Sequence, residues 1–347
     1  MNCRICSDRL RLLYTSDLLP EYIWPTNKKI KYSKCKVYEC INCKILQLQN
    51  FSEKKIKSFY GNESFVLTNK KKKKMRLNYI EKNYGKKILH NKKILDIGGG
   101  INPVSYNKNL DIVDFLISPQ VKKVHKGNIF IKDINKEYIK KKYDVLFLIH
   151  TLEHLKFPKK TLININQMMK PNSKLFIEVP NFDFFIRNRP HYALFHQHLN
   201  MFCIKSLQTI LALGNLKIEK IFTKSKDEVI FCSVIKTKIK AKINKINNIK
   251  KIQILKNQKN KVKKNLIKFF GNNEINLFGA GGSSALFLSN YSFLNKKLNK
   301  VFDNDKKKIN KKFLGIKKIE KKRSKNLNIF FSLSSYNLDK KNNYRIV

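Results

Sequence analysis

The chain has 347 residues, 42% of them hydrophobic, which is enough for two or three domains with packed cores. Its formal net charge of +50 would normally indicate nucleic acid or an anionic membrane as partner. The lysines, however, are spread along almost the whole chain, and Lys, Asn and Ile are the residues that AT-rich codons specify. We therefore attribute the charge to composition and do not expect a nucleic acid partner, although anionic substrates such as nucleotide diphosphates would be attracted.

The N-terminal residues carry no apolar segment of the kind that a secretory signal requires. No stretch approaches the roughly 18 apolar residues of a membrane span. Seven cysteines in a chain without a secretion signal indicate metal ligands or free thiols more than disulfides. We expect a cytoplasmic protein with no membrane span.

Four cysteines near the N-terminus form two Cys-x-x-Cys pairs: Cys3, Cys6, Cys40 and Cys43. Four thiolates in two close pairs suit the tetrahedral coordination of Zn²⁺ in a closed structural site, so we predict a zinc-binding domain over residues 1–62. Cys35 lies outside the pairing. The segment has little apolar sequence of its own, so it would need the metal to fold. The alternative is a set of unrelated buried thiols.

The apolar run 94–97 contains Asp96 and leads into Gly98, Gly99 and Gly100. This pattern predicts a buried parallel strand that turns into a loop, where glycines let the backbone approach a ligand closely. The spacing is neither G-x-G-x-x-G nor that of a phosphate loop. An Asp two residues before the glycines resembles the loop of class I S-adenosylmethionine (SAM) methyltransferases, although glycine after a strand is also ordinary turn chemistry.

From residue 92 the pattern alternates between strands and helices, which predicts a doubly wound α/β sheet over 63–237. The expected strands are 94–97, 111–117, 129–133, 143–149, 174–179, 216–222 and 228–235. A helix is expected over 204–213, and the lysine run 70–74 is interpreted as a solvated helix start or linker.

Ligands in such sheets bind at the carboxyl ends of the strands, so residues at several strand ends should converge on one pocket. The expected cofactor-binding side chains there, besides the glycines, are Asp96, Asp114, Asp133 and His150. Carboxylates can accept the ribose hydroxyls of SAM or face its adenine amine or ammonium group. In the usual form an acid stands at the tip of the second strand. Here Ser118 and Pro119 stand at that tip, and Asp114 is the nearest acid.

Two histidine-containing segments follow. Glu153 and His154 lie too near each other for a two-histidine metal helix of the H-E-x-x-H kind, so no metal is expected there. The segment 189–203 contains three histidines, His191, His196 and His198, and a histidine near neutrality can take a proton from a hydroxyl or beside a carbonyl. Metal binding by these histidines is an alternative, but the run holds no carboxylate. Hydrogen-bonded core histidines are another.

Residues 236–268 contain little but Lys, Asn and Ile, with Ile at helical spacing, so 238–270 is predicted to be a helical linker. Glycines 279, 281 and 282 then begin a second strand–glycine–helix unit, whose helix N-terminus could hold a phosphate. Acids follow at 303 and 305. The segment 271–347 is only half the length of a Rossmann fold, so bound NAD is not expected.

Taken together, the chain resembles the three-part sugar-nucleotide C-methyltransferases, which have an N-terminal zinc domain, a central SAM domain and a C-terminal Rossmann-like domain. The cysteine pairs with Leu46-Gln-Leu48 resemble the zinc segment of that family, and Asp96 to Gly100 with Leu152-Glu-His154 resemble its SAM motifs. Phe195-His-Gln-His198-Leu resembles its Tyr-His-Glu-His-Leu segment, and the C-terminal glycines and acids resemble its half-Rossmann unit.

The resemblance implies SAM-dependent methyl transfer to a nucleotide-linked sugar, in surface glycan biosynthesis, with a structural Zn²⁺. His198 carries over as the base, with His196 and Gln197 beside it. Phe195 and Gln197 stand where the family has Tyr and Glu, so the base loses a phenol and a carboxylate and its pKa should be lower. O-methylation of a sugar hydroxyl is therefore a rival to C-methylation.

Two further alternatives remain open. The zinc motif, the SAM motifs and the charge would also fit an RNA methyltransferase. The exchanges at Phe195 and Gln197 would also fit a non-catalytic relative that binds sugar nucleotides. The segment 60–65 departs too, because the family has a tyrosine-rich run there.

Overall fold

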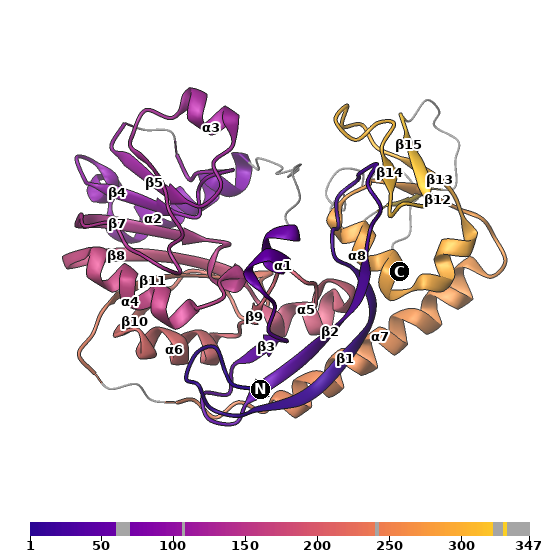
Figure 1. Cartoon of the computed structure of the whole chain (residues 1–347), viewed down its shortest axis with the longest axis horizontal. Helices are drawn as coiled ribbons and strands as arrows, with labels where there is room; N and C mark the ends of the chain where they lie inside the picture. The colour runs from indigo at the N-terminus through magenta and orange to yellow at the C-terminus, as the bar shows by residue number, and fades with distance from the viewer. Residues whose placement is uncertain (60–69, 106–107, 240–242, 322–328, 332–347) are drawn as a thin grey trace.

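The computed structural model describes residues 1–59, 70–105, 108–239, 243–321 and 329–331, so the 60–65 segment lies outside it. The described chain folds around three sheets of four, seven and five strands (Figure 1). The seven-stranded sheet lies at one end of the molecule and the five-stranded sheet at the other. The four-stranded sheet runs between them.

The N-terminal sheet has the order β1-β2-β3-β9, with all neighbours antiparallel. Its strands are β1 (Leu10–Pro20), β2 (Tyr32–Cys40), β3 (Leu46–Leu48) and β9 (Asn200–Met201). The long β1–β2 hairpin extends from the seven-stranded sheet to the C-terminal unit (Figure 1). Its fourth strand, β9, comes from the central part of the chain, so the N-terminal segment is joined to the central domain through backbone hydrogen bonds.

The central sheet has the order β10-β11-β8-β7-β4-β5-β6, and only β10 and β11 are antiparallel to their neighbours. The strands are β4 (Ile94–Ile97), β5 (Leu110–Asp114), β6 (Ile129–Ile131), β7 (Tyr143–Ile149), β8 (Met169–Pro180), β10 (Leu216–Ile221) and β11 (Val229–Lys236). The chain order reverses between β4 and β7, and ligands of open α/β sheets bind at the carboxyl ends of the strands at such a switch point. The predicted doubly wound fold is confirmed.

Helices and short 3-10 turns connect these strands. They are α1 (Glu53–Ser58), α2 (Lys70–Tyr84), η1 (Lys86–Leu89), α3 (Pro119–Val124), η2 (Leu152–His154), α4 (Pro158–Met168), α5 (Phe182–Asn188), η3 (Pro190–Tyr192) and α6 (Ile204–Leu213). The lysine run 70–74 forms the first turns of α2. The predicted helix at 204–213 is confirmed.

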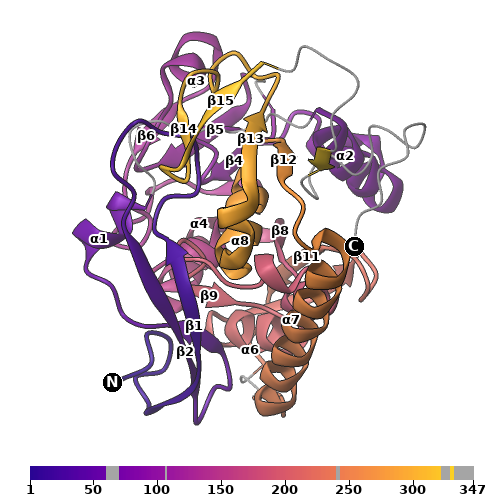
Figure 2. The same ribbon diagram turned by 90° about the vertical axis from the view of Figure 1, so that its right-hand side faces the viewer.

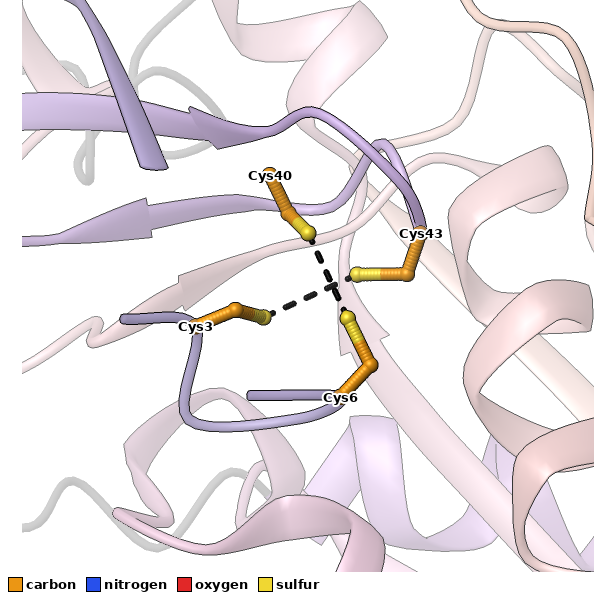
Figure 3. A group of neighbouring side chains, drawn as sticks. All are labelled: Cys3, Cys6, Cys40 and Cys43. Atoms are coloured by element: carbon orange, nitrogen blue, oxygen red, sulfur yellow. Dashed lines mark hydrogen bonds between the residues drawn. The ribbon is translucent and has the colours of Figure 1, made fainter. Parts of the chain in front are cut away.

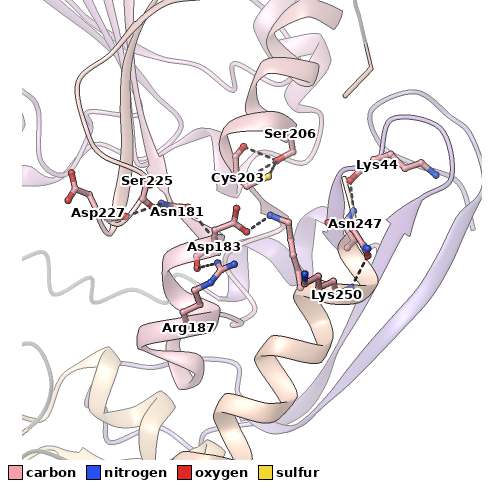
Figure 4. A network of polar contacts seen from close by, with 12 residues as sticks. Lys44, Asn181, Asp183, Arg187, Cys203, Ser206, Ser225, Asp227, Asn247 and Lys250 are labelled. Carbon is pink, nitrogen blue, oxygen red and sulfur yellow. Dashed lines mark hydrogen bonds and ion pairs between the residues drawn. The ribbon is translucent and has the colours of Figure 1, made fainter. Parts of the chain in front are cut away.

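Helix α7 (Asn248–Phe270) joins the central and C-terminal parts and begins ten residues later than the predicted linker helix. Asn247 caps it, since its side chain accepts a hydrogen bond from the Lys250 amide (Figure 4). One stripe of the helix is buried: Asn248, Ile252, Leu255, Lys259, Leu266 and Phe270. Ile252 and Leu255 pack with residues of β1 and α5, and Leu266 and Phe270 enter the core of the C-terminal unit, so α7 is a packed element and not a free spacer.

The C-terminal unit is a small α/β sheet of order β14-β15-β13-β12-β16, as predicted for a half-Rossmann unit. Its elements are β12 (Ile275–Phe278), α8 (Gly282–Asn290), η4 (Ser292–Lys297), β13 (Leu298–Phe302), β14 (Lys312–Phe313), β15 (Lys317–Glu320) and β16 (Ile329–Phe331). Its core also contains Ile23 and Phe195, from the N-terminal hairpin and the central domain. Helix α8 faces these parts (Figure 2). Among the described helices, none has both the length and the apolar composition to cross a bilayer.

Candidate functional site

The four predicted cysteine ligands converge (Figure 3). Their sulfur atoms all lie within 4.8 Å of one another, with Cys3 and Cys43 3.8 Å apart and Cys6 and Cys40 3.3 Å apart. A tetrahedral Zn²⁺ with bonds of ~2.3 Å holds its sulfurs about 3.8 Å apart, so the arrangement fits this ion. Cys35 is buried elsewhere in β2 and is not part of the group.

Hydrogen-bond donors surround the sulfur of Cys3, as is usual for a metal thiolate. The Ile5 amide lies 3.3 Å from it and the Gln47 side-chain amide 3.1 Å. The hydrogen bond with the Cys43 thiol, together with these donors, lowers the pKa of Cys3 to about 4. These hydrogen-bond donors therefore favour the thiolate form of Cys3 even without a bound metal.

Arg4, inside the first Cys-x-x-Cys pair, connects the cysteine group to the central domain. Its guanidinium donates to the Leu48 carbonyl at 3.2 Å and to the Leu199 carbonyl at 2.6 Å. Leu199 directly follows His198. The cysteine group thus supports the backbone that carries the predicted catalytic histidine.

The glycine loop follows β4 at the switch point. Gly98 has φ +85°, and a Cβ there would lie 2.2 Å from the Thr151 hydroxyl oxygen. A Cβ on Gly99 would lie 2.4 Å from the Asp96 carboxylate, and one on Gly100 would lie 2.0 Å from a backbone carbonyl. All three glycines are therefore required by packing within the loop, in addition to any ligand.

Substituting Gly98→Ala should destabilise the fold by about 1–3 kcal/mol, because alanine disfavours this backbone conformation and its methyl group displaces Thr151. We expect weaker S-adenosylhomocysteine binding by calorimetry as well. Gly281→Ala is the matched control, since Gly281 has φ −117° and an added Cβ would meet nothing within 4 Å. Equal effects of the two substitutions would contradict this account.

The predicted acids gather beside the loop. The Asp96 carboxylate is buried and accepts the Val104 amide at 2.7 Å, and burial raises its pKa to about 7. Asp114 ends β5 and accepts the Gly100 amide at 3.0 Å, and burial raises its pKa to about 6. Asp133 lies near enough for its charge to raise the Asp114 pKa further, and it also caps the turn at Asn135.

A buried ion-pair network lies on the other side of the switch point. Arg76 of α2 binds the Glu178 carboxylate through two hydrogen bonds, at 2.7 and 2.6 Å. Glu178, at the end of β8, also contacts His150 Nε2 at 2.8 Å, and His150 Nδ1 lies 3.3 Å from Glu153. Burial opposes charging of Glu178, but the bonds to Arg76 and His150 outweigh it and lower its pKa to about 2.

His150 titrates in the opposite direction. Burial disfavours its charged form, but hydrogen bonds to Glu153 and Glu178 outweigh burial and raise its pKa to about 9 from an ordinary 6.5. The ring therefore carries a positive charge at neutral pH. The backbone at His150 is left-handed, with φ +48°, which aims the ring back at these carboxylates.

This shift predicts a pH dependence of stability. Because the folded pKa exceeds the unfolded one, the stabilisation by His150 is fully present below pH 6.5 and is lost as the pH rises toward 9. Denaturant unfolding of the wild type and His150→Gln across pH 6–10 should show a difference that shrinks over this window. A constant difference would mean that the charge of the ring contributes nothing.

His198 lies in the histidine loop, residues 189–199, next to His154. The two ring centroids are 4.9 Å apart, and the Phe195 ring lies 4.0 Å from His198. Burial, together with the nearby His154 and His150, holds the pKa of His198 well below its usual range. Its imidazole is therefore neutral near pH 7 and able to accept a proton.

The other residues of the histidine loop face different parts of the molecule. His196 Nε2 lies 2.9 Å from the Ser33 hydroxyl, among aromatic rings, and burial lowers its pKa to about 4. Gln197 donates its side-chain amide to the Phe59 carbonyl at 2.6 Å. His191 packs against Phe287 of α8. The predicted partners His196 and Gln197 thus lie against the N-terminal segment, and His198 faces the central domain.

Sequence reasoning missed three residues of this region: Arg76, Thr151 and Glu178. Glu178 carried a signal, because it is a lone acid inside the apolar strand 174–179. Arg76 carried none, since it lies in a helix full of basic residues and only the fold brings it to Glu178.

A doubly wound sheet whose glycine loop and buried acids meet at the switch point forms a ligand site of the kind found in open α/β sheets. Residues 72–221 match the family model described as a methyltransferase domain. This segment contains the glycine loop, the acids and the histidine loop.

Solved structures with similar folds include methyltransferases. The chain is 13% identical to the 1,6-didemethyltoxoflavin-N1-methyltransferase of Burkholderia thailandensis (TM-score 0.41; 57% of this chain and 97% of that one). It is 14% identical to the PH0226 protein of Pyrococcus horikoshii (TM-score 0.41; 55% and 100%) and 17% identical to the mitomycin 7-O-methyltransferase MmcR (TM-score 0.33; 42% and 48%). The match thus spans about half the length of MmcR. No curated protein matches the chain.

Proposed function

We propose that the protein transfers the methyl group of SAM to a nucleotide-linked sugar, with His198 as the base. The main support for this proposal is the position of the histidine loop, which contacts the N-terminal segment, the central domain and the C-terminal unit. Phe195 enters the C-terminal core, His196 contacts the N-terminal hairpin, and His198 meets His154 edge to face beside the switch point. An acceptor held between these parts would lie close to a cofactor at the switch point.

SAM supplies an electrophilic methyl group on a sulfonium. The residues that would hold it surround the switch point: Asp96, Gly98, Gly99, Gly100, Asp114, Asp133 and His150. Buried carboxylates that accept backbone amides suit the ribose hydroxyls and the ammonium group of this ligand. Zn²⁺ would be held by the four cysteines in a structural role, because four thiolates leave no open position.

The surroundings of His198 favour a hydroxyl as the methyl acceptor. The ring is a weak base, since its pKa is held low, and Phe195 offers it no hydrogen bond. The amide of Gln197 is directed to a backbone carbonyl and not to the ring. Removing a proton from carbon needs more assistance than removing one from a hydroxyl, so we favour O-methylation over C-methylation.

The first test is a calorimetric titration with S-adenosylhomocysteine, repeated with dTDP-, GDP- and CDP-sugars. Binding of both ligands supports the proposal and names the nucleotide. Binding of the cofactor alone would remove the sugar nucleotide, and salt-sensitive RNA binding would then be measured instead. Binding of neither would overturn the cofactor site itself.

His198→Asn should lower turnover by about 10²–10⁴-fold while leaving S-adenosylhomocysteine affinity nearly unchanged, because a base contributes to that extent and does not hold the cofactor. The exposed His90, replaced by Gln, is the matched control. A parallel loss of cofactor affinity would show that His198 supports the cofactor site and is not the base.

A further inference from the structure

A second group of metal-type ligands lies beside the switch point, far in sequence from the cysteines. One ligand atom from each of Glu153, His154 and His198 lies within 4.8 Å of the others. Glu153 and His154 come from η2, directly after β7, and His198 comes from the histidine loop. The sequence spacing of Glu153 and His154 indicated no metal, but the third ligand comes from 44 residues further along the chain.

Glu153 has an unsatisfied oxygen. Its side chain is 1% exposed, and its Oε2 atom has no hydrogen-bond partner among the described residues. Its other oxygen, Oε1, lies 3.3 Å from His150 Nδ1 and 3.7 Å from His154 Nε2. The charged His150 ring faces Oε1 and not Oε2. A buried carboxylate oxygen without a donor is costly, so a species is expected opposite Oε2.

His154 is oriented as a metal ligand would be. Its Nδ1 lies 2.8 Å from the Gln197 carbonyl, which can only accept, so Nδ1 carries the hydrogen. In the neutral ring, Nε2 then holds the lone pair and faces the Glu153 carboxylate. A backbone carbonyl behind one ring nitrogen is the usual support for a histidine that binds metal through the other.

Space for an ion exists at the same place. A cavity of about 10 Å³ is lined by Glu153, His198 and Asn200, together with apolar residues of α5 and β9. A volume of this size takes one water molecule or one ion. The lining therefore includes two of the three ligand residues, Glu153 and His198.

We propose that Glu153, His154 and His198 bind a divalent transition-metal cation such as Co²⁺ or Zn²⁺. Two imidazoles and one carboxylate suit these borderline cations and leave coordination positions open, whereas Mg²⁺ and Ca²⁺ prefer oxygen ligands throughout. The site rests on this geometry alone and not on the proposed reaction.

Cation binding and proton acceptance would use the same imidazole. If His198 is the base, an added cation should inhibit methyl transfer by occupying its lone pair. If the cation instead activates transfer, an acceptor hydroxyl on the cation loses its proton to solvent before its oxygen attacks the methyl group, and the base assignment fails while the metal site stands.

The test titrates Co²⁺ into zinc-loaded full-length protein, followed by calorimetry and visible absorption. We expect one equivalent of Co²⁺ with the weak bands of nitrogen and oxygen ligation, no sulfur charge-transfer band and no zinc release. Glu153→Gln and His198→Asn should each weaken this binding by at least about 100-fold. His90→Gln should leave it unchanged.

If the folded, zinc-loaded wild type binds no Co²⁺, the proposal is overturned and the cavity holds only a water. Unchanged binding in both Glu153→Gln and His198→Asn would also overturn it, as adventitious binding elsewhere. Because the isotherm needs no substrate, failure of the metal site is distinguishable from failure of the proposed methyl transfer.

Discussion

Replacing Cys43 by serine is expected to unfold the cysteine group and to weaken S-adenosylhomocysteine binding in the neighbouring domain. Zinc binding contributes about 10–16 kcal/mol of apparent free energy in isolated zinc-finger peptides, which exceeds the stability of so small a unit. The effect should spread, because Arg4 and the pairing of β3 with β9 join this unit to the backbone that follows His198. Zinc content, limited proteolysis and calorimetry would measure it.

Cys35→Ser is the matched control. Cys35 lies in β2 of the same hairpin and is fully buried, but its sulfur is not part of the cysteine group. This variant should keep one zinc per chain and lose stability only through the buried hydroxyl. Equal zinc loss in the two variants would contradict a four-cysteine site, and zinc-independent folding of Cys43→Ser would contradict its structural role.

Replacing Arg76 by alanine should destabilise the fold by about 3–5 kcal/mol, because it leaves the Glu178 carboxylate buried with His150 as its remaining ion-pair partner. The Arg76 and Glu178 side chains are only 11% and 3% exposed, so solvent screens this pair weakly. Urea unfolding at pH 7 would measure the loss. Because α2 is anchored beside the switch point through this pair, cofactor affinity should fall as well.

The exposed pair Lys132–Glu137 provides the comparison, with side chains 37% and 51% exposed. Lys132→Ala should cost less than about 1 kcal/mol, since solvent screens such a pair. If the two alanine substitutions cost the same, the Arg76–Glu178 bridge does not anchor α2. The assignment of Glu178 as a buried anion beside the switch point would then be wrong.

Local patterns predicted most of the central domain. The strands at 94–97 and 143–149 and the helix at 204–213 begin and end as expected, because their apolar periodicity coincides with their burial. The second strand was placed too late, at 111–117, since the apolar residues after Asp114 continue the pattern beyond the last backbone pair. The linker helix was placed too early, because lysine and isoleucine repeats carry no start signal before the Asn247 cap.

For the candidate site too, some residues were predictable from the sequence and others were not. The cysteine pairs, the glycine loop and the acids at strand ends were readable from spacing, because each is a short contiguous motif whose chemistry depends on its neighbours. His196 and Gln197 were grouped with His198 on adjacency alone. The structure directs them toward the N-terminal hairpin, because successive residues of an irregular loop point in different directions.

The sequence by itself determined a zinc-type cysteine group, a class I methyltransferase sheet and a second, smaller α/β unit, since these depend on local periodicity and motif spacing. Only the tertiary structure decided how they combine. It brought Arg76 to Glu178, added β9 to the N-terminal sheet, and set the carboxylate of Glu153 against His198. Contacts between residues far apart in the chain depend on packing, and no spacing rule along a single sequence encodes them.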